Sequence, residues 1–151
     1  MARYVTTADN LVALNSTIPF NSVSIPCNNG NVIPLAPGIL NLKGNTTNRF
    51  ARYLVTLQGN IQVPTGGTVT PIAIALTVSG AVIPDSVAII TPAAVGEYQH
   101  VSVSVPITVP SGCCVTVSAV YTDGTEDDPA VTPTPSIQIR REASLTVDRI
   151  A

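Results

Sequence analysis

The sequence of 151 residues predicts an all-β protein, an antiparallel jelly-roll β-sandwich. Three observations predict it. Apolar and polar residues alternate with a period of two, turns containing Gly and Pro separate the alternating segments, and no segment longer than one turn has a helical period. Such alternation places one side of each strand in a core and the other at the surface. We count about eight strands, which suits a jelly roll that limits exposed sheet edges.

The alternation becomes regular only after the first residues, so the chain is expected to have two parts. Residues 1–19 lack the two-residue period and are predicted to form an extended N-terminal arm. Residues 20–151 are predicted to form the jelly-roll domain. A chain of this length that folds alone buries roughly 70% of its unfolded surface, so a substantial core is expected.

Two long strands are predicted in the middle of the chain. In residues 51–63 the odd positions are apolar or glycine and the even positions are mostly polar. In residues 70–78 the large apolar side chains occupy even positions, with the small Ala73 and Ala75 opposite. The pair Ser79-Gly80 then predicts a tight hairpin, because glycine accepts the positive φ that such turns require.

The clearest alternation lies in residues 100–109, where every odd position is Val or Ile. The opposite side carries small polar residues, among them Ser102 and Ser104. Residues 113–121 repeat the pattern with Val and Ala inside. Shorter apolar pairs predict the last two strands, at 137–139 and 145–147.

The composition excludes several classes of function. Charged residues make up 11% of the chain and the net charge is −2, whereas a typical globular chain has about 25% charged residues. So few cations predict no nucleic-acid binding. The apolar runs are too short for a transmembrane helix, so no membrane insertion is expected. A surface so poor in charge predicts that other subunits cover much of it.

No catalytic residue, metal site or cofactor is predicted, and we do not expect an enzyme. His100 is the only histidine, and no nucleophile motif accompanies it, so it is expected at a surface or interface. The adjacent Cys113 and Cys114 lack the spacer that lets two thiolates bind one zinc ion. With Cys27, which is expected to be buried, they are expected to be reduced and largely inert thiols. Cys113 has the parity of the predicted core residues Val115 and Val117, so Cys114 is expected on the opposite face. The acidic residues 126–128 are expected to form a solvated loop.

Four segments together resemble a known family: Phe50-Ala-Arg-Tyr-Leu-Val, residues 74–86, residues 101–112 and residues 143–151. In order and spacing they resemble the tumour-necrosis-factor-like (complement globular-head-like) jelly-roll domains of bacterial and bacteriophage surface proteins, over about residues 20–151. The resemblance implies a tight homotrimer. The collagen-like stalk of the spore-coat members is missing, and a short arm before the head favours a bacteriophage virion component.

The leading interpretation is therefore a structural virion protein, a trimeric capsid decoration or head-fibre protein on the outer capsid surface. The beginning of the chain does not resemble a signal peptide, so synthesis in the host cytoplasm is expected. The expected partner is the major capsid protein or another virion subunit. The arm residues expected to anchor the protein are Arg3, Tyr4, Val5, Leu11, Val12 and Leu14. The small residues expected at the trimer interface are Ala73, Ala75, Ser102 and Ser104.

The alternative is a binding module, a receptor- or glycan-binding knob of a phage fibre or of a spore or cell-surface protein. A site for a host-surface glycan would need exposed aromatic rings. The chain has six aromatic residues and no tryptophan. Tyr98 and Tyr121 are the candidates because they lie near predicted loops.

Overall fold

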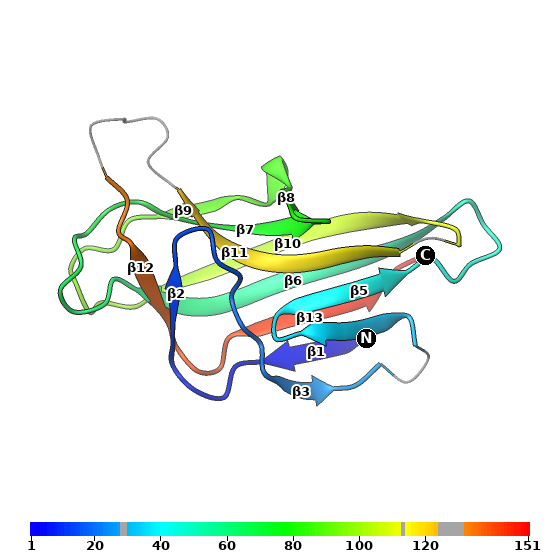
Figure 1. The fold of residues 1–151 in the computed structure, drawn as a ribbon, viewed down its shortest axis with the longest axis horizontal. Coiled ribbons are helices and arrows are strands. Elements are labelled where there is room, and N and C mark those ends of the chain that lie inside the picture. The colour runs from blue at the N-terminus through cyan, green and yellow to red at the C-terminus, as the bar shows by residue number, and fades with distance from the viewer. Residues whose placement is uncertain (28–29, 113, 124–131) are drawn as a thin grey trace.

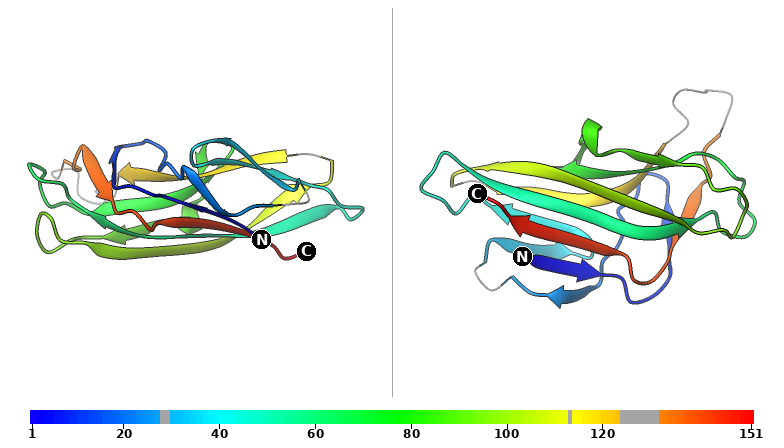
Figure 2. Two further views of the ribbon diagram at one scale, coloured as in Figure 1. Left: turned by 90° about the horizontal axis from the view of Figure 1, so that it is seen from below. Right: turned by 180° about the vertical axis from the view of Figure 1, so that it is seen from behind.

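The computed structural model is a flattened sandwich of two antiparallel β-sheets. Figure 1 shows its broad face, and Figure 2 shows it from below and from behind. The structure describes residues 1–27, 30–112, 114–123 and 132–151. The elements in chain order are β1 (Ala2–Val5), β2 (Asn10–Ala13), β3 (Ser22–Ile25), β4 (Val32–Ala36), β5 (Ile39–Lys43), β6 (Phe50–Gln62), β7 (Ile72–Val78), β8 (Ala81–Val82), the 3₁₀ turn η1 (Pro84–Ser86), β9 (Ala88–Ile90), β10 (Gln99–Pro110), β11 (Cys114–Asp123), β12 (Ser136–Ile139) and β13 (Ser144–Arg149). The predicted all-β, antiparallel architecture is confirmed.

Sheet A is built around β6, the longest strand. β10 pairs with one side of β6, and β13 and β12 pair with successive parts of its other side. β1 follows β13 in the sheet, and β3 lies beyond β1. β2 pairs with β12. Sheet A therefore has β10 at one edge and β3 at the other, with β2 beyond β12.

Sheet B has the strand order β4-β5-β11-β7-β8, and β9 pairs with β7 beside β8. β4 is one edge of this sheet, and β8 and β9 form the other. The chain just after β2 also joins sheet B. The N–H of Asn15 donates to the Tyr121 carbonyl at 2.7 Å, and the N–H of Ile18 donates to the Ala119 carbonyl at 2.8 Å.

The prediction of an extended arm over residues 1–19 is wrong, because this segment belongs to the sandwich. β1 lies between β13 and β3, so it is paired on both sides. Ala2, Tyr4 and Val12 are 3% exposed or less and lie in the core. The segment shows no long alternation because its strands are four residues each and the chain then crosses from sheet A to sheet B.

The core lies between the sheets and follows the strand period. In β10 the odd residues 101–109 are buried and the even residues 100–110 are exposed, as predicted. Two large core side chains, Tyr53 and Tyr121, donate their hydroxyls to backbone carbonyls at 2.6 and 2.7 Å. These hydrogen bonds satisfy both phenolic hydroxyls, so the two rings can be buried in the core.

Glycine has a specific structural role at two positions, the hairpin after β7 and the middle of β6. The predicted hairpin at Ser79-Gly80 is confirmed: both residues have positive φ (52° and 84°) and join β7 to β8. In β6, a Cβ at Gly59 would lie 2.9 Å from the Cβ of Ala143, where the chain passes from β12 to β13. Glycine at this position lets the two segments approach.

The number of strands exceeds the prediction of about eight, since thirteen occur among the described residues. The additional strands are short. β8 has two residues, β9 has three, and β1, β2 and β3 have four each. A period of two cannot be recognised in segments of this length.

Candidate functional site

The outer face of sheet A carries a broad surface of neutral polar side chains. We call it the neutral face and define it by Thr56, Gln58 and Asn60 of β6 with Ser102 and Ser104 of β10. The register pairs Thr56 with Ser104 and Gln58 with Ser102, so the two rows stand side by side. The β10 residues are exposed and the β6 residues are half-buried. Strand alternation produces this face, because the apolar residues between them point into the core.

The polar groups on and beside the neutral face hydrogen-bond to one another across strands. The hydroxyls of Thr56 and Ser104 are 3.0 Å apart. Asn60 Oδ1 lies 3.3 Å from Nδ1 of the exposed His100. At the end of β6, the amide of Gln62 donates to Gln138 of β12 at 2.8 Å. These contacts hold short side chains in place over a surface without charge.

Charged side chains lie around the neutral face rather than on it. Arg3, Arg52 and Asp148 share its side of sheet A, because each alternates with a core residue. The N-terminal ammonium lies 3.9 Å from Asp148, a long and half-exposed ion pair. Nε of Arg3 is buried and has no hydrogen-bond partner in the part of the chain that the structure describes. The same holds for Oγ of Ser144, and neither atom is accessible to a docking group.

The four residues predicted for a trimer interface do not form one surface. Ser102 and Ser104 are exposed on sheet A. Ala73 and Ala75 lie on sheet B and are 1% and 0% exposed within a single subunit. They are paired with β11 on one side, and Ala73 is also paired with Ile89 of β9, so larger neighbours cover these small side chains. The prediction of Ala73 and Ala75 as interface residues is therefore corrected.

The six predicted anchoring residues are integrated into the fold to different degrees. Tyr4 and Val12 are core residues, and burial raises the pKa of the Tyr4 hydroxyl, with a smaller contribution from nearby Cys27. Arg3, Val5 and Leu14 are half-buried. Leu11 is 67% exposed. These residues cannot reach out as a flexible arm, because most of them pair or pack within the domain.

The two tyrosines considered for a glycan site differ in accessibility. Tyr121 is 0% exposed in the core, so it cannot contact a glycan and its candidacy is corrected. Tyr98 is half-buried, and the guanidinium carbon of Arg140 lies 5.8 Å from its ring centroid. Sequence reasoning did not consider Phe50, which is 40% exposed with Arg49 5.3 Å from its ring.

Of the described cysteines, Cys114 follows its strand parity and Cys27 is less buried than expected. Cys114 is exposed and Cys27 is half-buried. Cys113 and the acidic residues 126–128 lie outside the described residues. Within the described ranges, no group of three or more His, Cys, Asp or Glu side chains is placed to hold a metal ion. Likewise, no described helix has the length and apolar character to cross a membrane.

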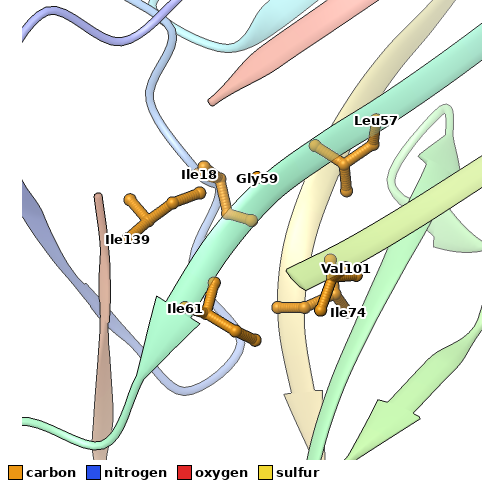
Figure 3. Close-up of a pocket in the computed structure, with 7 residues that line it drawn as sticks. All are labelled: Ile18, Leu57, Gly59, Ile61, Ile74, Val101 and Ile139. Carbon is orange, nitrogen blue, oxygen red and sulfur yellow. The ribbon is translucent and has the colours of Figure 1, made fainter. Parts of the chain in front are cut away.

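A small void lies inside the core between the two sheets (Figure 3). Its volume is about 10 Å³ and its surroundings are apolar. It is lined by Ile18, Leu57, Gly59, Ile61, Ile74, Val101 and Ile139. A void of roughly one water molecule with no polar partner stays empty and binds nothing. It is a packing defect rather than a ligand site.

A larger hollow opens at the surface where β3 and β4 lie near each other. This hollow, the β3–β4 groove, has a volume of about 200 Å³. It is lined by Tyr4, Phe20, Asn21, Ser22, Val23, Pro34, Leu35, Ala36 and Pro37. No sequence pattern indicates this groove, because its two walls belong to segments of different sheets.

Comparison with solved structures assigns the fold. Eiger TNF from S. frugiperda aligns with a TM-score of 0.64 over 99% of this chain and 91% of that chain, at 9% sequence identity. The fold is a tumour-necrosis-factor-like jelly roll. The C-terminal domain of EclA, a sugar-binding protein, aligns with a TM-score of 0.34 over 85% of this chain and 90% of that chain, at 13% identity. No family model and no curated protein matches the sequence.

The jelly-roll fold expected from the sequence is thus confirmed, and so is its tumour-necrosis-factor-like character. A likeness at such low identity concerns the fold alone. The bacteriophage part of the expectation stays a prediction.

Proposed function

We propose that the protein is a structural subunit of a virion, a capsid decoration or head-fibre protein that acts as a homotrimer on the outer capsid surface. The observation that carries the proposal is the neutral face of sheet A. The centre of a protein–protein interface is depleted in charged residues, as this face is.

The neutral face suits contact with another subunit for a physical reason. Its serine and threonine side chains are short, so a second sheet or strand can approach closely. No charge has to be desolvated at its centre, and Ser102 and Ser104 offer hydroxyls that can donate or accept.

Attachment to the major capsid protein takes a different route from the one expected from the sequence. Because β1 and β2 are strands of sheet A, withdrawing them would expose core side chains such as Tyr4 and Val12. We therefore assign attachment to a surface of the folded trimer. Leu11, exposed on β2, is the predicted anchoring residue that remains accessible.

The mass in solution tests the trimer. Sedimentation velocity at micromolar concentration should give three times the 15.6 kDa of one chain. Ser104→Arg places a charge in the neutral face and should shift the protein to monomers. Thr68→Arg, in an exposed loop outside this face, is the matched control and should stay trimeric. A monomeric wild-type protein, or a trimer indifferent to Ser104→Arg, would contradict the assignment of the interface.

The location is tested on native particles. Gold-labelled antibody raised against the purified protein should decorate the capsid shell in electron micrographs. Labelling confined to a tail fibre would favour the alternative of a receptor- or glycan-binding knob. Labelling of no particle would overturn the virion assignment.

The half-buried Tyr98, with Arg140 over its ring, favours this alternative because a ring stacked on a guanidinium is held in a fixed position. A glycan array would test it. A bound glycan should lose affinity with Tyr98→Ala and keep it with Phe50→Ala, the other exposed aromatic next to an arginine.

A further inference from the structure

One long side of the sandwich is open. β3 is the last strand of sheet A on this side, and β4 is the last strand of sheet B. Both lie on the side of the N-terminal strands (Figure 1). The β3–β4 groove lies between them.

The groove has an uncharged lining in which apolar side chains lie beside the polar Asn21 and Ser22. None of its nine lining residues is charged, and rings of Tyr4, Phe20, Pro34 and Pro37 contribute to it. Val23 and Leu35 line the groove and are 50% and 57% exposed. Covering such side chains with apolar groups is favourable, because it removes apolar surface from water. A charged ligand would lose hydration here without gaining a partner.

The edge strand beside the groove offers unpaired main-chain groups. β3 pairs only with β1 in the described part of the chain, so the N–H and C=O groups on its outer side have no strand partner. Neither proline nor a charged residue occurs within Ser22–Ile25. Such an unprotected edge accepts a further strand. The opposite edge strand of sheet A, β10, contains Pro106 and Pro110.

The size of the site decides between a peptide and a second copy of the domain. A stable interface between globular proteins buries at least about 1,000 Å². The four residues of β3 offer only about 13 Å of strand edge, which suits a short extended segment better than the broad contact of a second domain. The site matches a short extended segment that inserts one or two aliphatic side chains.

We propose that β3 and the β3–β4 groove bind an extended, uncharged peptide segment of a partner protein. The segment adds as a strand to the outer edge of β3 and places every second side chain, apolar and of aliphatic size, in the groove. This mode combines main-chain hydrogen bonds for affinity with a side-chain pocket for selectivity. It goes beyond the function proposed above, because it requires neither a trimer nor a capsid.

The test uses a synthetic probe, the peptide acetyl-Thr-Val-Thr-Val-Thr-Val-Thr-amide, titrated into the full-length ¹⁵N-labelled protein. Its addition should shift the backbone amide signals of Ser22–Ile25 and protect them from hydrogen exchange. A peptide with Glu in place of Val should not bind, because the groove has no cation. A peptide with N-methylated valines should also fail, because it cannot donate to the edge of β3.

A matched pair of variants locates the site. Leu35→Arg introduces a charge at the groove and should weaken binding of the valine peptide about tenfold or more, as loss of a central interface contact does. Ile89→Arg changes a residue of nearly equal exposure, 56% against 57%, on the opposite edge of sheet B and should leave binding unchanged. Both positions are exposed, so both variants are expected to fold, which the dispersion of the amide spectrum verifies.

Three results would overturn the proposal. The valine peptide could leave the β3 signals unshifted at millimolar concentration. The N-methylated or Glu-containing peptide could bind as well as the valine peptide. Leu35→Arg and Ile89→Arg could have the same effect. None of these results depends on the oligomeric state, so the virion proposal would stand or fall separately.

Discussion

The two long sides of the sandwich are constructed differently. On one side, β10 of sheet A lies against β9 and η1, which follow the edge of sheet B. Ser86 of η1 is 1% exposed; its hydroxyl accepts from the Leu76 N–H at 3.0 Å and donates to the Ile83 carbonyl at 2.7 Å. On the other side, no element comparable to η1 lies between β3 and β4 in the described chain, and the groove remains.

This difference shows how one chain can protect one sheet edge and leave another available. On the closed side, Pro106 and Pro110 lie in a strand that is paired with β6 over its whole length. A proline in such a strand has its nitrogen on the unpaired side, where it removes a donor that another strand would need. On the open side, β3 lacks this protection. The closed side is covered by η1 and β9, whereas the outer edge of β3 has no strand partner among the described residues.

The largest expected effect comes from truncating matched isoleucines on the two sides. Ile107 in β10 is 4% exposed and Ile25 in β3 is 38% exposed. Ile107→Ala should lower the free energy of unfolding by about 2–4 kcal/mol, because it leaves a cavity in a packed core. Ile25→Ala should cost less than about 1 kcal/mol, as for a partly exposed side chain. Urea denaturation measures the free energy of unfolding of both variants. Equal decreases would show that the two sides contribute equally to stability.

A somewhat smaller effect is expected at η1. Ser86→Ala removes the hydroxyl that accepts the Leu76 N–H and leaves that donor buried. The loss should be about 1–3 kcal/mol, the cost of an unsatisfied buried polar group. Ser24→Ala on the exposed strand β3 is the control and should change stability by less than about 0.5 kcal/mol. If Ser86→Ala leaves the free energy of unfolding unchanged, the hydrogen bonds of η1 do not stabilise the closed side.

The pH dependence of stability probes Tyr4, which lies in β1 next to the open side. Its pKa is raised above 10.0, first by burial and then by Cys27. The folded state therefore holds this proton more tightly than the unfolded state. The contribution to stability is complete below pH 10 and decreases as the pH rises from there toward the folded-state pKa. Tyr4→Phe should flatten this decrease in denaturation midpoints measured from pH 8 to 11.

That profile contains a second contribution, which serves as an internal reference. Burial also raises the pKa of Tyr53, while the positive charge of Arg149 opposes this. The denaturation midpoint of Tyr4→Phe should therefore still decrease somewhat between pH 8 and 11. A profile identical to that of the wild type would show that Tyr4 ionises as freely when folded as when unfolded.

The smallest effect is expected at the internal void. Val101 belongs to β10 and lines this void of about 10 Å³ (Figure 3). Val101→Ile adds one methylene and should raise the free energy of unfolding by about 0.5–1 kcal/mol, as cavity-filling changes commonly do. Val103→Ile, in the same strand but not lining the void, should be neutral or destabilising. Thermal denaturation compares the two, and a gain at both positions would argue against the void as the cause.

The sequence predicted the parts of the fold in which local pattern and tertiary environment agree. β6, β7, β10 and β11 are long enough to show alternation, and the Ser79-Gly80 turn has a local conformational requirement. β1, β2 and β3 have four residues each, too few for a period to be recognised. Their place in the sheet depends on partners such as β13, more than a hundred residues away along the chain.

The candidate sites were less predictable than the fold. Alternation placed Ser102 and Ser104 on an outer face correctly. The same rule could not tell that Ala73 is covered, because its cover comes from β9 and β11. The β3–β4 groove requires two strand edges from different sheets to lie next to each other, which no local pattern reports.

Two strands from opposite ends of the described chain, β1 and β13, pair with each other. Ala2–Val5 are hydrogen-bonded in register with Val147–Ser144, so sheet A cannot be completed until β13 has left the ribosome. At about 5–20 residues per second, the apolar side chains of β1 stay without their partner for on the order of ten seconds. Pairings of such long sequence separation also place the domain among slow folders, in the range of roughly milliseconds to seconds. In any partly folded state that lacks β13, the core side chains Ala2 and Tyr4 of β1 are therefore left without the strand that covers them.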